Sequence, residues 1–196
     1  MNLYMKWNRI CLLLLICLSN IGCTHKQNIG DKMIQIRSKQ ITIPLKSMFC
    51  IKNTTEQIAM QENQLKLIVY LDSVNCSTCT LRNMYVWHEL MNKAKTYKES
   101  LYFYFILHPL QSENKESLYL TAKGLHFPVP IYIDTLNCFS KENPHIPNDP
   151  LMHTFLLDDQ NNVILVGDPT KNPRIEEMFW RIVKEKLGEP KDSVGR

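Results

Sequence analysis

The chain has 196 residues, a formal net charge of +4 at pH 7, and a composition of 44% hydrophobic and 21% charged residues. These proportions fit a folded globular protein and exclude an intrinsically disordered chain, and the length suits one domain plus an export segment. The basic residues form no dense cluster, so we expect no nucleic-acid partner.

Residues 1–22 have the pattern of a secretory signal peptide. Lys6 and Arg9 precede nine apolar residues, 10–18, and a few smaller residues follow them. Nine apolar residues are too few to cross a bilayer, which takes roughly 20. We therefore predict that this segment directs export and is removed, with an uncleaved anchor helix as the alternative.

Cys23 follows the signal directly. Residues 21–23, Ile-Gly-Cys, resemble the end of a bacterial lipobox, in which the cysteine becomes the lipidated first residue. Asn20 stands where that motif usually has an aliphatic residue, so cleavage with release of the chain is the alternative. We expect Cys23 to anchor the protein to the membrane of a bacterial cell envelope, facing the periplasm or the exterior. Residues 23–60 then form a polar tether and an N-terminal β extension.

The first expected element is a half-buried strand or hairpin at 34–45, where apolar and polar residues alternate as far as Pro44. Residues 65–71 and 101–107 are almost continuously apolar and rich in β-branched and aromatic residues, which predicts two strands covered on both faces. Between them, residues 78–96 carry apolar side chains three or four positions apart and predict a helix.

The second half of the chain continues with a helix and a strand and ends with a hairpin and a helix. Residues 135–152, which contain three prolines, predict a long loop. Five polar residues separate the two strands of the hairpin, and the last helix has one apolar stripe. The expected bounds are helix 112–125, strand 129–134, strands 154–157 and 163–166, and helix 174–187.

This order of elements predicts the fold class. Helices between the early strands imply parallel pairing, and the short turn implies an antiparallel hairpin at the end. We predict an α/β protein with a thioredoxin-like fold: a central mixed sheet flanked by helices, with an N-terminal strand or hairpin extension. The domain is expected to span residues 61–190, followed by a polar tail at 191–196.

Cys76 and Cys79 lie at the end of a predicted strand and the start of a predicted helix, with Ser77 and Thr78 between them. Two cysteines at this spacing can close a small disulfide ring. Backbone N–H groups at a helix N-terminus favour the thiolate of the first cysteine, whose pKa in such sites is roughly 3.5–7 instead of ~8.5. We therefore predict Cys76 as the nucleophile and Cys79 as the cysteine that resolves the mixed disulfide.

Other uses of this pair remain open. A zinc site would need a second Cys or His pair, which does not follow, so we expect no metal and no other cofactor. Copper delivery would need a wider cysteine spacing, and peroxide reduction would need a proline and a threonine just upstream of the cysteine. A static structural disulfide in a fold that only binds partners is the main alternative to catalysis.

The pair, together with residues 154–158 (Thr-Phe-Leu-Leu-Asp) and 162–167 (Asn-Val-Ile-Leu-Val-Gly), resembles the TlpA/redoxin branch of thioredoxin-like, envelope thiol–disulfide oxidoreductases. The resemblance covers roughly residues 60–190 and implies exchange of disulfides with exported proteins and an unknown redox partner. Members usually carry a tryptophan before the pair and a proline within it. They also have a cis-proline three residues before the phenylalanine, where this chain has Met152. These departures favour the alternative, a non-catalytic, lipid-anchored interaction protein with a structural disulfide.

Four residues are candidate accessories of the pair. Asp72 could tune the first cysteine, accept a proton from the second, or cap the following loop. Cys138 could be an inert thiol, or it could form a disulfide with Cys50 or with a cysteine of the active-site pair. Met152 and Thr154 lie where the family's substrate-docking loop enters its strand, and we expect loop 144–153 to approach the cysteines.

Overall fold

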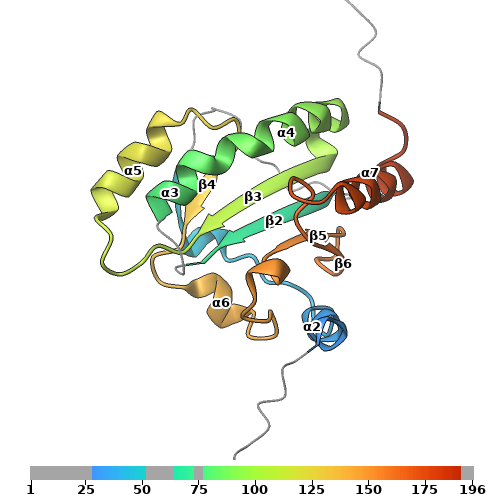
Figure 1. Cartoon of the computed structure of the whole chain (residues 1–196), viewed down its shortest axis with the longest axis horizontal. Helices are drawn as coiled ribbons and strands as arrows, with labels where there is room; N and C mark the ends of the chain where they lie inside the picture. The colour runs from blue at the N-terminus through green and yellow to red at the C-terminus, as the bar shows by residue number, and fades with distance from the viewer. Residues whose placement is uncertain (1–27, 52–63, 73–76, 191–196) are drawn as a thin grey trace, which may run out of the picture.

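The computed structural model describes residues 28–51, 64–72 and 77–190. At its centre is a six-stranded sheet with the order β1-β4-β3-β2-β5-β6, and helices cover both faces (Figure 1). The strands are β1 (Phe49–Ile51), β2 (Leu65–Leu71), β3 (Leu101–Leu107), β4 (Ile131–Ile133), β5 (Thr154–Leu157) and β6 (Val163–Val166).

The sheet is mixed. β2 and β3 are parallel over their whole length, from Leu65 opposite Leu101 to Leu71 opposite Leu107, and β4 is parallel to β3. β5 is antiparallel to both β2 and β6, and β1 is antiparallel to β4 at one edge. This order and these directions are those of a thioredoxin-like fold, so the predicted fold class is confirmed.

Two hydrophobic clusters lie on opposite faces of the sheet. Leu67 and Val69 of β2 point into the cluster beneath α3 (Ser77–Arg82), α4 (His88–Ala94), α5 (Lys115–Gly124) and α7 (Pro173–Leu187). Ile68 and Tyr70 point into the cluster beneath α2 (Ile29–Ile36) and α6 (Cys138–Glu142). Coverage on both faces explains why β2 and β3 are apolar at nearly every position.

The helix predicted at 78–96 is present but changes geometry along its length. α3 passes into a 3-10 segment, η2 (Asn83–Trp87), and α4 is followed by η3 (Lys95–Ser100). The buried side chains Leu81, Met84, Trp87 and Leu90 are spaced by three residues. A 3-10 helix has three residues per turn, so this spacing keeps all four on the side that faces the sheet.

The strand or hairpin predicted at 34–45 is wrong. Residues 29–36 form α2, whose N-terminus is capped by the Asn28 side chain, which accepts a hydrogen bond of 2.8 Å from the Asp31 N–H. Ile36 is buried whereas Ile34 is exposed, so the alternation in the sequence does not define one face of a strand. The strand of the N-terminal extension is β1, which begins at Phe49.

The loop predicted at 135–152 also contains helical segments, α6 and η4 (Pro150–Met152). The two carboxylate oxygens of Asp134 accept hydrogen bonds of 2.8 Å from the N–H groups of Cys138 and Phe139. These bonds satisfy free donors at the start of α6. Asp134 lies four residues before the first residue of α6, outside the usual N-cap position, so the sequence did not indicate that it caps a helix.

The N-terminal extension is tied to the domain by partly buried polar contacts. The side chain of Asn143, which is 1% exposed, accepts a hydrogen bond of 2.8 Å from the Thr42 N–H and donates one of 2.8 Å to the Thr42 carbonyl. Lys32 of α2 also pairs with Asp149, and this contact lowers the pKa of the Asp149 carboxyl group. No helix among the described residues is long and apolar enough to cross a membrane.

Replacing Asn143 with alanine should destabilise the protein. The Asn143→Ala change removes two part-buried hydrogen bonds to the Thr42 backbone and a buried one to the Phe139 carbonyl, each worth about 0.5–1.5 kcal/mol. We expect the free energy of unfolding in urea to fall by roughly 2–4 kcal/mol. Asn92→Ala, on the exposed face of α4, is the control and should change it by less than about 0.5 kcal/mol. Equal effects of the two substitutions would contradict this role for Asn143.

Candidate active site

The site lies at the edge of the sheet where the two central parallel strands end. Because β2 and β3 run in the same direction, the segments that follow Leu71 and Leu107 emerge at one edge. Cys79 lies in the first turn of α3 and is exposed. Cys76, the predicted nucleophile, and Cys23, the predicted lipidation site, lie outside the described residues.

A cleft of about 690 Å³ opens beside Cys79. The end of β2 contributes Asp72 to its lining, and the loop before β5 contributes Pro150 and His153. Thr154, the first residue of β5, also lines the cleft. The loop 144–153 therefore does approach the described cysteine of the pair, as expected from the sequence.

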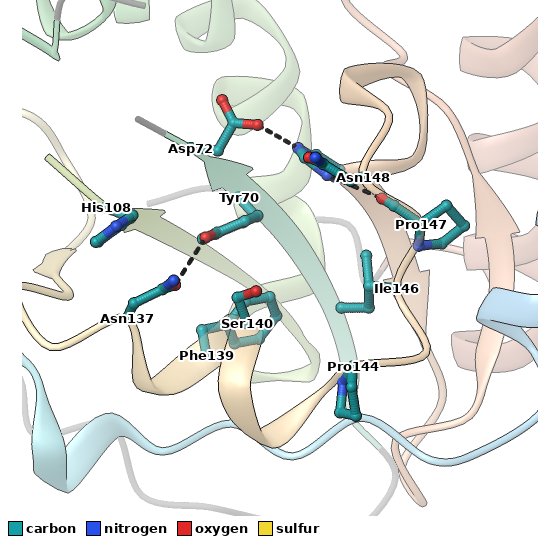
Figure 2. Close-up of a pocket in the computed structure, with 11 residues that line it drawn as sticks. Tyr70, Asp72, His108, Asn137, Phe139, Ser140, Pro144, Ile146, Pro147 and Asn148 are labelled. Carbon is teal, nitrogen blue, oxygen red and sulfur yellow. Dashed lines mark hydrogen bonds and ion pairs between the residues drawn. The ribbon is translucent and has the colours of Figure 1, made fainter. Parts of the chain in front are cut away.

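Asp72 and His153 form a close pair on this cleft. The imidazole Nδ1 lies 3.3 Å from Asp72 Oδ2, and Nε2 lies 3.1 Å from the Pro147 carbonyl oxygen (Figure 2). A carbonyl oxygen only accepts hydrogen bonds, so Nε2 carries a proton. The pair brings a carboxylate and an imidazole together on the cleft that Cys79 also lines.

The buried position of His153 fixes this pair. His153 is 5% exposed, and its ring packs edge-on against Tyr70, with 5.2 Å between the ring centroids. Its backbone carbonyl accepts a hydrogen bond of 2.8 Å from the Tyr70 N–H, which extends the pairing of β2 with β5. Sequence spacing did not predict the contact of His153 with Asp72, because it joins segments far apart in the sequence.

A second cavity of about 450 Å³ also has Asp72 and His153 in its lining, and Figure 2 shows the residues around it. Burial is the largest cause that raises the pKa of Tyr70 to about 12, with Asp134 and Asp72 adding to it. The Tyr70 hydroxyl therefore stays protonated at neutral pH and donates a hydrogen bond of 3.3 Å to Asn137 Oδ1. His108 Nδ1 lies 2.8 Å from the Asp134 carbonyl oxygen, so this nitrogen also carries a proton.

A carboxylate from the loop after β3 meets the start of the cysteine helix. Glu113 Oε1 accepts a hydrogen bond of 2.7 Å from the Ser77 N–H, the first backbone donor of α3. The second oxygen, Oε2, accepts one of 3.1 Å from the Leu110 N–H. The two segments are 36 residues apart in the sequence, so spacing gave no sign of this contact.

The described contacts of the other predicted accessory residues stabilise the fold. Met152 is buried beneath the sheet, and the Thr154 carbonyl accepts a hydrogen bond from the Gly167 N–H. Cys138 forms no disulfide with another described cysteine, and its N–H is bound by Asp134. Within the described ranges all peptide bonds are trans, including the one before Pro150. No cluster of His, Cys, Asp and Glu side chains suited to a metal ion occurs among the residues with described positions.

Comparison with known proteins gives structural likenesses only. No protein-family model matches the chain, and no curated protein matches it. The chain is similar to a thioredoxin-like protein solved in its oxidised form, with 17% identity, 78% of this chain and 98% of that chain covered, and a TM-score of 0.48. It is also similar to StoA from Bacillus subtilis, with 18% identity, 60% and 84% covered, and a TM-score of 0.44. The chain's own strand order and directions identify its fold as thioredoxin-like.

Proposed function

We propose that this protein is a thiol–disulfide oxidoreductase that exchanges disulfides with other proteins through Cys76 and Cys79. The observation that carries the proposal is the position of Cys79, exposed in the first turn of the helix that follows the central strand β2. Cys76 immediately precedes that helix in the sequence. Cys79 also shares a cleft with Asp72, a group able to exchange a proton with a thiol.

The exchange needs two attacks by sulfur. The Cys76 thiolate attacks one sulfur of a substrate disulfide, forms a mixed disulfide and releases the first substrate thiolate. Cys79 then loses its proton and attacks the Cys76 sulfur, which breaks the mixed disulfide and releases the second substrate thiolate. The substrate disulfide is reduced by two electrons, and the Cys76–Cys79 disulfide forms. A dithiol protein must return two electrons to the pair for another turnover, and the reverse sequence oxidises a substrate dithiol.

Asp72 is proposed to take the proton that Cys79 loses. Its carboxylate lies on the same cleft as Cys79 and in contact with the His153 imidazole. The imidazole holds the carboxylate in position through its own bond to the Pro147 carbonyl. The Asp72–His153 pair can therefore accept or return a proton without a large rearrangement.

The proposed setting is the bacterial cell envelope. The signal-like residues 1–22 and the lipobox-like cysteine at Cys23 support export and a lipid anchor. The substrates are then the thiols and disulfides of exported proteins, in a compartment where disulfides persist. The exchange uses only the two cysteine sulfurs and needs no cofactor.

A non-catalytic interaction protein with a structural disulfide is the second candidate. The observation that favours it is the entry to β5, where Met152 stands in place of the expected proline and the described peptide bonds are trans. The two candidates differ in whether Cys76 and Cys79 react one after the other with the disulfide of another protein.

Substituting each cysteine separately should give different results. Cys79→Ser should trap mixed disulfides with exported proteins, because Cys76 can still attack and nothing resolves the product. Cys76→Ser should trap none. The adducts would be detected in cells by non-reducing gels and identified by mass spectrometry, with Cys138→Ser as the control that leaves the pair intact. If neither variant trapped partners and both lost the same thermal stability, the pair would be a structural disulfide.

Replacing the proposed proton acceptor should slow only the second attack. In Asp72→Asn, we expect the rate at which Cys79 resolves a preformed mixed disulfide to fall on the order of 10²-fold, a usual size for general acid–base catalysis. Formation of the mixed disulfide should change little. Stopped-flow measurements on each step separate the two rates. Asp168→Asn removes another carboxylate that lines the cleft and should leave both steps nearly unchanged; equal slowing in the two variants would refute the role of Asp72.

A further inference from the structure

The cavity of about 450 Å³ has no role in the proposed exchange reaction. Its lining shares Tyr70, Asp72 and His153 with the lining of the cleft beside Cys79, so the cavity and the cleft adjoin. Its volume falls in the range of about 300–1,000 Å³ that is usual for ligand pockets. A residue near the disulfide of a substrate protein can therefore reach the cavity when that disulfide lies at Cys79.

One part of the cavity wall is apolar. The fully buried ring of Phe139 in α6 contributes to it, and so do three residues of the loop that follows α6, Pro144, Ile146 and Pro147 (Figure 2). A surface of this kind packs against the methylene groups of a long side chain. Lysine and arginine often bury their stems in this way while the charged head contacts polar groups.

The polar part of the wall offers hydrogen-bond acceptors, because two of its donors are used within the protein. The Tyr70 hydroxyl donates to Asn137 Oδ1 at 3.3 Å, and His108 Nδ1 donates to the Asp134 carbonyl at 2.8 Å. In a neutral imidazole the other nitrogen is an acceptor, so His108 offers Nε2. An amide oxygen has two lone pairs, so Asn137 Oδ1 can accept a second bond. These groups suit a ligand that donates hydrogen bonds.

The charges around the cavity favour a cation. Asp72 is the acidic residue in its lining, and among the described residues no lysine or arginine lines it. The buried carboxylate of Asp134 binds the N–H of Phe139 in the wall. Burial is the largest cause that raises the pKa of the Tyr70 hydroxyl to about 12, and the charges of Asp134 and Asp72 contribute to the rise. The negative potential of both carboxylates therefore reaches a group that lines the cavity.

We propose that this cavity binds a lysine or arginine side chain of the substrate protein, close to the disulfide that undergoes exchange. This inference rests on the proposed function and names the class of substrate. The stem of the bound side chain packs against Phe139 and Ile146. Its charged head donates hydrogen bonds to His108 Nε2 and Asn137 Oδ1, beside the Asp72 carboxylate. The cavity thereby selects exported proteins that carry a basic residue near a cysteine.

The test compares peptides that differ in one charge. Each probe is a synthetic peptide with one cysteine, joined to glutathione as a mixed disulfide. It carries either lysine or norleucine, an uncharged analogue, at a position that is moved stepwise away from the cysteine. The full-length protein is reduced beforehand, and mass spectrometry follows the release of both thiols in a single turnover as the protein dithiol becomes a disulfide. At the best spacing, the lysine peptide should react on the order of tenfold faster, the effect of one hydrogen bond to a charged group.

Three variants locate the origin of this preference. Ser140→Lys and Asn148→Lys each place a basic side chain of the protein itself at an exposed position on the cavity wall. Both should lose the preference for the lysine peptide and keep the wild-type rate with the norleucine peptide. Leu136→Lys is the matched control, because it adds the same charge at an exposed residue that is not part of the lining. It should keep the preference.

The outcomes separate this inference from the proposed function. Equal rates for the two peptides at every spacing would overturn the inference and leave the proposed function standing. The same conclusion would follow from a preference that survives both cavity variants, or from one that falls equally in all three variants. A wild-type protein that reacts with none of the peptides would overturn the proposed function and the inference together.

Discussion

The parallel pairing of β2 with β3 is the constraint on which the site depends. Its unbroken register brings the segments after Leu71 and Leu107 to the same edge of the sheet. One segment contributes Asp72 and leads to the cysteines, and the other contributes Glu113. β5 pairs with the opposite side of β2 and brings His153 to this edge. The three polar side chains around the cysteine helix therefore come from three neighbouring elements of one buried sheet.

These side chains meet the cysteine helix at different points. Asp72 and His153 share the cleft with Cys79, and the Asp72 carboxylate is the proposed acceptor of the proton that the second thiol loses. Glu113 binds the first N–H of α3, directly after Cys76, and adds a negative charge there. The Glu113 contact joins the loop after β3 to the start of that helix.

The sequence predicted the fold well and the surroundings of the cysteines poorly, for physical reasons. β2, β3, β5 and β6 have the predicted bounds, because burial on both faces produces continuous apolar runs. The prediction failed at α2 and α6, where the side chains of Asn28 and Asp134 accept hydrogen bonds from backbone N–H groups and fix the local structure. The position of Cys79 at a helix start followed from the pattern. The contacts of His153 and Glu113 did not, because they join segments that only the folded sheet brings together.

The most direct measurement is the equilibrium of the wild-type cysteine pair with glutathione buffers of known potential. The account predicts a disulfide that forms and opens reversibly, with a potential in the range of disulfide-exchange proteins, between the ≈ −270 mV of thioredoxin and the ≈ −120 mV of a strong oxidant. A pair that stays oxidised at potentials below ≈ −300 mV would be a structural disulfide. That result, or two thiols that never form a disulfide, would contradict the claim that this protein exchanges disulfides.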